Sequence, residues 1–541
     1  MPEIKDSQNQ PQNNQQKPPS PIKHLFVLML ENRSFDHIFG FSRFEGADPR
    51  TGVHATARDL TGFEPLFAPT HTGRSLVREG APYQLDDRDG DSDPGHEFTD
   101  TVLALCGKQT FAKLTDAEIA RKLAGDEFIC PSRIYPAMLS APTQWEYAVG
   151  YGYHAAAHPD QVLRCFSPSQ LPVLNQLAAE FVLCDNWFSS MPGPAWPNRF
   201  FALCGSSGHL DHSPAGWRAI LADAFNTNGY KFVHGSMFDH LDDKWLIVRG
   251  DNVQALAIEG LDAHVDSRMV EYDDFHAMLK HKTLDASFIW LEPDYGAFFN
   301  FRYGNSMHPY ADVRKGEWLV KNVYEHIRQS AYWESSALLV LFDEHGGFYD
   351  HVKPPGPDNA LIPGDANLNQ TGPDPANKHD FKFDILGPRV PAIVISPWVT
   401  KHGIDKTRYD HASIARTAAE LFDRPELILT KRVANAASFH DLFNLKQPRL
   451  FPGEAPWTLN RPIRDHWSWL KALWPRRKPK QFTAAMWAFS SVAVREKLAR
   501  TWQTAPMQVA RIGKMFAGLK NEEDGKRFLK STIGIYRKRR K

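Results

Sequence analysis

Four short runs of apolar residues most constrain the fold of this chain. Each run is about six residues long, rich in β-branched or aromatic side chains, and apolar at consecutive positions rather than at every second one. Strands with helices on both faces of their sheet have this pattern. The runs are HLFVLML (His24–Leu30), ASFIWLE (Ala286–Glu292), ALLVLF (Ala337–Phe342) and PAIVIS (Pro391–Ser396).

Helical patterns alternate with these runs, at 318–331 and 411–423. Alternating strands and helices predict an α/β sandwich with a central, mostly parallel sheet covered by helices. Residues 41–160 and 205–280 are polar and rich in turn-forming residues, and we expect them to be loop-rich insertions beside the site.

Charge is distributed unevenly along the chain, although the total is zero. Residues 446–541 contain 23 Lys/Arg against 6 Asp/Glu, so the first 445 residues are acidic. We predict three parts: a disordered polar arm (1–22), a catalytic domain (23–445) and a basic, Trp-containing helical tail (446–541). The tail suits peripheral contact with an anionic membrane surface. The alternative is a docked helical domain whose basic face is solvated, and nothing in the core favours nucleic acid.

Cysteine usage and the amino terminus indicate the compartment. The five cysteines show no C-x-x-C spacing, which argues against a disulfide framework or a structural zinc site. Residues 1–22 have no apolar stretch of signal-peptide length, and no run reaches the roughly 18–20 apolar residues of a membrane span. We expect a protein made in the cytoplasm, with export by a signal-independent machine as the alternative.

Two of the predicted strands run directly into acidic residues. Glu31-Asn32 follows the first strand, and Asp343-Glu344-His345 follows the third. Sites in open α/β sheets lie at the carboxyl ends of strands, so these clusters converge if the strands are neighbours. Their oxygens suit a divalent cation. The alternatives are an ordinary turn capped by Asn32 and a solvated turn after the later strand.

Three unusual blocks carry a family resemblance: LENRSFDHIFG, MPGPAWPNRFF and FDEHGGFYDHV. Together with DPGHEF and MHPY, they occur in the same order in a phosphoesterase family. That family includes bacterial phosphatidylcholine-type phospholipases C, plant non-specific phospholipases C and a bacterial acid phosphatase, within the alkaline-phosphatase-like superfamily. The resemblance covers residue 22 to about 445.

The resemblance implies one divalent metal ion, held by Glu31, Asn32, Asp343 and Glu344. These ligands admit calcium, magnesium, manganese or zinc. In the family, a metal-bound Thr or Ser hydroxyl attacks phosphorus and forms a phosphoenzyme. The histidines matching those that donate a proton and steady the phosphoryl oxygens are His96 and His308.

Further residues are assigned around this set. His345 is placed with the catalytic residues; its alternatives, like those of His351, are a metal ligand, an acid or a helper that orients a carboxylate. Asn198 and Arg199 are expected to shape their loop and contact phosphate, with pairing of Arg199 to a core carboxylate as the alternative. Asp350, His351 and His411 are expected to support the site. Asp294, at the end of another predicted strand, is a weaker candidate carboxylate.

The chain departs from its family at the nucleophile. Gly193, Pro194, Pro197 and Asn198 fix the register, so Ala195 occupies the position of the family's Thr or Ser. Three explanations stand: an engineered nucleophile-to-alanine variant, direct attack by water, or a relative without catalysis. Ser189 and Ser190 lie upstream in a proline-constrained stretch and are not expected to substitute.

The expected function is hydrolysis of a phospholipid to diacylglycerol and a phosphorylated headgroup. A phosphomonoesterase shares the same metal site and is the first alternative. A non-catalytic protein that binds lipid or phosphate is the alternative from another class, and Ala195 is its main support.

Overall fold

The computed structural model describes residues 20–60, 67–70, 73–85, 93–106, 159–214, 229–297, 301–356, 377–379, 381–449 and 459–462, with single residues 492, 496 and 527. Most of the polar arm and most of the tail lie outside this part of the chain. The predicted division into three domains therefore stays a prediction.

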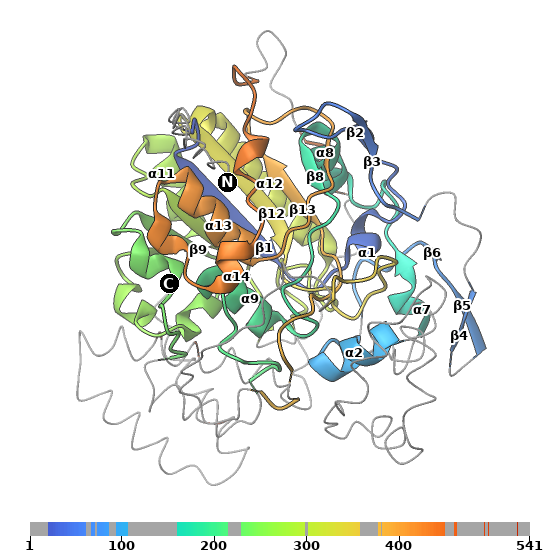
Figure 1. The fold of residues 1–541 in the computed structure, drawn as a ribbon. Coiled ribbons are helices and arrows are strands. Elements are labelled where there is room, and N and C mark those ends of the chain that lie inside the picture. Colours follow the sequence, from blue (N-terminus) through green and yellow to red (C-terminus); the bar gives the residue numbers. More distant parts are fainter. Residues whose placement is uncertain are drawn as a thin grey trace, which may run out of the picture.

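A ten-stranded sheet forms the centre of the molecule, in the order β10-β9-β11-β1-β12-β13-β8-β14-β2-β3 (Figure 1). Its middle consists of β11 (Phe288–Glu292), β1 (His24–Leu30) and β12 (Ser336–Phe342), which pair in parallel. Beyond them, β9 (Trp245–Arg249) and β10 (Met269–Glu271) continue the parallel pairing. Because β1 lies between β11 and β12, the segments after these three strands meet at one edge.

The other half of the sheet is mixed. β13 (Ala392–Ile395) is antiparallel to both β12 and β8 (Val182–Cys184). β14 (Gly403–Asp405) returns to parallel pairing, and β2 (Glu45–Ala47) and β3 (His54–Thr56) close this side.

Helices cover both faces of the sheet, as the apolar runs require (Figure 1). α8 (Pro172–Glu180), α11 (Tyr272–His281) and α12 (Val313–Gln329) pack together on one face. α9 (Ala195–Cys204), α13 (Ala412–Leu421) and α14 (Lys431–Asn435) pack together on the other. All residues of β12, and all of β1 after His24, are buried. The predicted α/β sandwich with a mostly parallel sheet is therefore confirmed.

The predicted element bounds agree closely with the structure, with one correction. The four apolar runs are strands, and the patterns at 318–331 and 411–423 fall on α12 and α13. The expectation that 41–160 and 205–280 are only insertions beside the site is wrong, because β2 and β3 in the first segment and β9 and β10 in the second extend the central sheet. These strands are short and stand between polar stretches, so the composition of the whole segments concealed them. Among the described helices, none has the length and hydropathy to cross a membrane.

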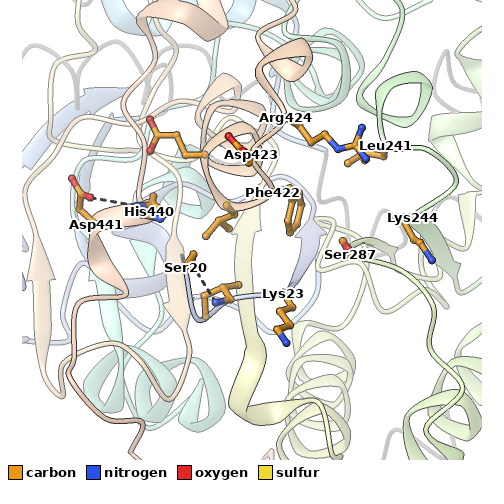
Figure 2. A pocket seen from close by; sticks show the side chains of 13 residues that line it. Ser20, Lys23, Leu241, Lys244, Ser287, Phe422, Asp423, Arg424, His440 and Asp441 are labelled. Atoms are coloured by element: carbon orange, nitrogen blue, oxygen red, sulfur yellow. Dashed lines mark hydrogen bonds and ion pairs between the residues drawn. The ribbon is translucent and has the colours of Figure 1, made fainter. Parts of the chain in front are cut away.

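A cavity of about 1110 Å³ lies at the amino-terminal edge of the sheet, away from the acidic strand ends. Lys23 and Ser287, which precede β1 and β11, line it together with residues after α13. Figure 2 shows that basic Lys23, Lys244 and Arg424 and acidic Asp423 and Asp441 surround it. Lys244 and Arg424 already form ion pairs. This mixed and partly paired lining gives the cavity no clear ligand chemistry.

The buried Glu317 joins two helices on one face. Its carboxyl oxygens accept the N–H groups of Val173 (3.0 Å) and Leu174 (2.7 Å) at the start of α8. Burial raises the pKa of Glu317 to about 8, outweighing the opposite effect of these hydrogen bonds. The folded state therefore keeps a proton that the unfolded chain releases at lower pH.

This proton gives stability a predictable pH dependence. Between the ordinary glutamate pKa of 4.5 and about 8, the contribution of Glu317 to the free energy of unfolding should fall as pH rises, by up to about 1.4 kcal/mol per pH unit. Glu317→Gln should remove this part of the slope. Urea denaturation of both proteins at about pH 5 and about pH 8 measures the difference. Equal slopes for the two proteins would contradict the assignment.

Candidate active site

Acidic residues follow four neighbouring parallel strands of the sheet. Asp251 comes after β9, Asp294 after β11, Glu31 after β1 and Asp343 after β12. Gly250 makes part of this convergence possible, because a Cβ there would lie 2.3 Å from the backbone nitrogen of Asp294. The structure therefore brings the predicted acidic clusters to one edge, together with Asp251, which the sequence reasoning had not singled out.

The turns after β1 and β12 interlock. Asn32 has a left-handed backbone (φ 59°), and its N–H donates to Asp343 Oδ1 (3.0 Å). Arg33 N–H donates to the carbonyl of Glu344 (2.9 Å). Gly346 has φ 66°, and a Cβ on it would lie 2.0 Å from the carbonyl oxygen of Asn32. Only glycine fits there, and this close contact fixes the two acidic turns relative to each other.

Three oxygen atoms of the predicted ligand set have no hydrogen-bond partner among the described residues. They are Glu31 Oε2, Asn32 Oδ1 and Glu344 Oε1, and all three are buried. Burial also raises the pKa values of Glu31 and Asp343, with Glu31 well above its usual value. Buried carboxylates are costly without a cation, so the donor set fits a hard divalent ion.

Asp343 differs from the other three because both of its oxygens are bonded. Oδ1 accepts the N–H groups of Asn32 and Glu344 (2.7 Å), and Oδ2 accepts Nε–H of Arg199 (2.9 Å). His411 Nε2–H donates to the carbonyl of Asp343 (2.6 Å), while its Nδ1 accepts the indole N–H of Trp187 (3.2 Å). Burial lowers the pKa of His411 to about 4, which agrees with a neutral ring. His411 therefore supports a predicted ligand directly.

His345 is buried beside the same turn. Its Nδ1 lies 3.1 Å from Glu344 Oε2, and the same oxygen accepts the N–H of Gly346 (2.7 Å). His345 therefore holds one oxygen of Glu344 while the other stays unpaired. This contact with Glu344 is typical of a residue that orients a metal ligand.

Ala195 is the first residue of α9, half-buried at the helix N-terminus. Arg199 is one turn further along, so the two side chains share a face, and Arg199 reaches Asp343. This places Ala195 toward the acidic edge. Nη1 of Arg199 is buried with no hydrogen-bond partner among the described residues.

Asn198 braces the loop in front of α9. Its Oδ1 accepts the N–H of Met191 (3.1 Å), and its Nδ2 lies 3.0–3.3 Å from the carbonyls of Met191, Gly193 and Pro194. Both polar atoms of the Asn198 side chain are thus bonded within the loop. These contacts support its predicted role in shaping the loop, whereas its predicted contact with phosphate stays a prediction. Ser189 and Ser190 are fully buried and bonded, to the carbonyls of Met191 and Pro388 and to Asp410.

Two imidazoles face the other side of the acidic turns. His96 Nε2 lies 3.3 Å from Asn32 Nδ2, and its Nδ1 donates to the carbonyl of Pro94 (2.7 Å). The ring centroids of His96 and His308 are 6.5 Å apart. Burial lowers the pKa of His96, but the charges of Glu344, Asp93 and Glu97 outweigh it and raise the value to about 10. Burial, together with the charges of His96 and Arg33, holds the pKa of His308 well below normal.

His308 is held by residues that the sequence analysis did not identify. Arg33 donates to the carbonyls of Met307 (2.7 Å) and His308 (3.2 Å), and the Phe301 ring stacks on His308 at 3.8 Å. Phe301 (φ 61°) and Met307 (φ 71°) both have left-handed backbones, which is strained for such side chains. Arg33 stands in the ENR block, but its partners are about 275 residues away, so the sequence alone carried no signal for this contact.

Asp350 and His351 lie in a different buried network. Arg389 pairs with Asp36 (3.1 Å), Asp185 (3.1 Å) and Asp350 (3.0 Å), and His351 Nδ1 lies 2.7 Å from Asp36. One ligand atom each of Asp36, Asp350 and His351 lie within 4.8 Å of one another, a spacing compatible with metal binding. Arg389 already supplies cationic charge there, and the carboxylate oxygens are hydrogen-bonded. This network connects α1 (Phe35–Phe39) to the segments after β8 and β12.

Removing the Arg389 guanidinium should therefore cost stability. Arg389→Met removes the guanidinium that three buried carboxylates share. Asp185 keeps Lys406 and Asp36 keeps His351, but Asp350 loses its ion pair, and we expect the free energy of unfolding to fall by about 3–5 kcal/mol. Arg416→Met, which breaks the half-exposed pair with Glu420 on α13, is the control and should have a much smaller effect. Chemical denaturation compares the two. Similar losses of unfolding free energy in the two variants would show that the Arg389 ion pairs contribute no more to stability than a half-exposed pair.

The acidic strand ends, the helix start at Ala195 and the two imidazoles lie at the carboxyl edge of the strands, where sites of open α/β sheets occur. The chain belongs to the Phosphoesterase family, whose model matches residues 22–425. The predicted family is thereby confirmed, and with it the class of phosphoric ester hydrolases.

Several named proteins are similar to this chain. Non-specific phospholipase C6 of Arabidopsis thaliana is 32% identical over 82% of this chain and 78% of its own length. Phospholipase C B of Mycobacterium tuberculosis is 26% identical over 79% of this chain and 78% of its own. A Vibrio parahaemolyticus protein of the alkaline phosphatase superfamily aligns in structure over 50% of this chain and 66% of its own, at 12% identity and a TM-score of 0.29.

Proposed function

We propose that this protein is a metal-dependent phosphoesterase of the phospholipase C type. Its substrate is a phospholipid, and the products are diacylglycerol and a phosphorylated headgroup. The observation that carries the proposal is the set of three unpaired, buried oxygens on Glu31, Asn32 and Glu344, next to the helix start at Ala195. The names of the similar plant and mycobacterial proteins support the substrate class.

Glu31, Asn32, Asp343 and Glu344 would hold one divalent ion, with Asp343 shared between the ion and Arg199. When bound, such an ion supplies Lewis-acid polarisation of the phosphoryl group. The four oxygen donors admit calcium, magnesium, manganese or zinc. The Asp36–Asp350–His351 group is not assigned an ion, because Arg389 balances its charge.

Two features of α9 suit a phosphate group. The free N–H groups at a helix start attract anions, and Ala195 is at that start. The unpaired Nη1 of Arg199 is a cationic donor one turn away on the same face. We assign these groups to the non-bridging phosphoryl oxygens, which they hold while the ester bond breaks.

The imidazoles of His96 and His308 have different roles. Hydrolysis adds water across the bond between phosphorus and the glycerol oxygen, so the leaving oxygen needs a proton. We assign His96 as its donor because it matches the family's histidine and lies at the acidic turns, with its Nε2 3.3 Å from Asn32 Nδ2. His308 is kept neutral by burial and by neighbouring cations, and its Nδ1 accepts the N–H of Tyr310 (3.3 Å), so its Nε2–H is the hydrogen-bond donor that we assign to a phosphoryl oxygen.

Ala195 leaves this site without the family's hydroxyl nucleophile. Ser189 and Ser190 do not replace it, because both are buried and bonded in the loop that precedes α9. We therefore expect turnover by the chain as written to be lower than that of Ala195→Thr by on the order of 10³-fold or more. The measurement is headgroup release from phosphatidylcholine, with para-nitrophenyl phosphate as the monoester comparison.

Each result of that comparison has a distinct meaning. Diester hydrolysis by Ala195→Thr alone supports the proposal. Faster cleavage of the monoester than of the diester would move the assignment to a phosphomonoesterase. If neither protein cleaves either substrate although both bind metal, a non-catalytic lipid- or phosphate-binding protein is the better description, and Ala195 is the residue that favours it.

Metal binding has a test that needs no turnover. Binding to the folded state alone raises stability, so a divalent ion should raise the melting temperature of the chain as written. Glu344→Gln keeps the shape of the side chain but weakens the donor set, and it should remove most of that rise. His351→Gln, in the Arg389 network, is the control and should keep it. Calorimetry with calcium, magnesium, manganese and zinc in turn checks this, and equal responses of all three proteins would contradict the ligand set.

A further inference from the structure

A buried imidazole that the proposed function does not use has an unpaired nitrogen. His212 Nδ1 lies 2.8 Å from Asp211 Oδ1, while His212 Nε2 is buried and has no hydrogen-bond partner among the described residues. His212 is 5% exposed and Asp211 is fully buried. Buried polar nitrogens are almost always bonded in native proteins, so this one is a candidate to meet a reacting group.

Asp211 determines which nitrogen of His212 carries the proton. Its Oδ1 also accepts the N–H of Lys378 (3.1 Å), and its Oδ2 accepts the N–H of His379 (2.8 Å). A carboxylate surrounded by N–H groups acts as an acceptor, so Nδ1 of His212 is the donor and Nε2 carries a lone pair. A carboxylate that orients an imidazole in this way prepares it to act as a general base.

The chain reverses direction after α9 and carries the Asp211–His212 dyad back along that helix. Gly205 (φ 64°), Gly208 (φ 68°) and His209 (φ 59°) have left-handed backbones in this turn. The His209 ring stacks on Phe383, with 5.6 Å between the ring centroids, and Phe383 also contacts Phe201 of α9 at 6.4 Å. The segment after the turn is thereby held beside the helix that begins at the candidate site.

The dyad contacts the segment that carries His96. Ser213, the next residue along the chain, donates its N–H to Glu97 Oε2 (3.0 Å), and Glu97 directly follows His96. His379, whose N–H bonds to the dyad, stacks on Phe98 with 5.0 Å between the ring centroids. Two independent contacts therefore join the dyad to the stretch from His96 to Phe98.

That stretch touches both the ligand turns and the loop in front of α9. Phe98 is the first residue of α2 (Phe98–Cys106), and a Cβ on Gly193 would lie 3.5 Å from its Cα. Gly193 is two residues before Ala195. His96 Nε2 lies 3.3 Å from Asn32 Nδ2. The dyad is thus attached to the wall of the site that lies between His96 and the start of α9.

The site needs a base because Ala195 has no hydroxyl. Water is then the nucleophile in the chain as written, and it must lose a proton as its oxygen bonds to phosphorus. His96 and His308 are both assigned as hydrogen-bond donors, so neither of them takes this proton. The unpaired Nε2 of His212 is an acceptor and has the required chemistry.

We infer that the Asp211–His212 dyad is the general base of the reaction. Nε2 of His212 takes a proton from water while the water oxygen bonds to phosphorus. The bond between phosphorus and the glycerol oxygen breaks, His96 protonates that oxygen, and His212 afterwards returns its proton to solvent. This inference rests on the proposed function.

A variant with a hydroxyl at position 195 separates the step that needs the dyad. In Ala195→Thr, the threonine hydroxyl attacks phosphorus first and diacylglycerol leaves. Water then attacks the phosphothreonine and releases the phosphorylated headgroup. The dyad takes the proton of the water, so it acts in the second half-reaction.

The test compares Ala195→Thr with and without His212→Asn, using a short-chain phosphatidylcholine. The asparagine amide can keep an N–H toward Asp211 and removes Nε2. Rapid quenching should show that diacylglycerol release in the first turnover changes by about twofold at most, while steady-state release of phosphocholine falls by about 10²-fold or more. Intact mass should show the covalent intermediate accumulating to about one equivalent in the double variant.

Three further measurements separate a base from a structural residue. His212→Asn should keep the parent's melting temperature, because the contact with Asp211 is retained. His209→Asn makes the same substitution at a half-buried imidazole of the same segment, and it should leave both phases of the reaction near the parent values. Nitrogen NMR of the parent should find the proton of His212 on Nδ1 and a bare Nε2.

Other outcomes would overturn the inference. A similar loss in both phases would make His212 a structural support of the site, and no loss in either phase would show that it is not the base. A proton on Nε2 in the NMR spectrum would refute the dyad whatever the activities are. If Ala195→Thr releases neither diacylglycerol nor headgroup, the proposed function fails and this inference fails with it. An active Ala195→Thr whose steady state is unchanged by His212→Asn would refute the dyad alone.

Discussion

The ion pair between Arg199 and Asp343 is the contact on which the candidate site depends. It joins a helix on one face of the sheet to the end of the central strand β12, across a buried edge where unpaired charge is costly. The same arginine also donates to the carbonyls of Met29 and Leu30 at the end of β1. One side chain thus sets the distance from the start of α9 to both acidic turns. Ala195 is held at this edge even though it contributes no chemistry.

The second buried arginine, Arg389, has a different role. It balances Asp36, Asp185 and Asp350, so the carboxylates around it are already bonded. At the strand ends, by contrast, Arg199 balances part of the charge and leaves oxygens of Glu31, Asn32 and Glu344 unpaired. This contrast between a satisfied and an unsatisfied acidic cluster is the physical reason for assigning the metal ion to one of them.

Some of the backbone strain lies at the same edge. Of the eleven described non-glycine residues with positive φ, three are here, namely Asn32, Phe301 and Met307, and Gly346 packs where no side chain fits. Hydrogen bonds from Arg33 and to Asp251 hold the surrounding loops in place. Left-handed residues of this kind persist only where the surrounding structure holds them, and here they fix His308 and the ligand turns.

The amino-acid sequence by itself determined four strands of the central sheet, two of the covering helices and the family, because continuous apolar runs and the three motif blocks are local patterns. It also placed Ala195, since the neighbouring glycine and prolines fix the register. It did not reveal the six shorter or edge strands β2, β3, β8, β9, β10 and β14, nor the separation of Asp350 and His351 from Glu344. The contacts of Arg33, Asp211, Asp251 and Arg389 were decided only by the tertiary structure. They join residues far apart in the chain, and which buried charges meet depends on how the sheet and helices pack together.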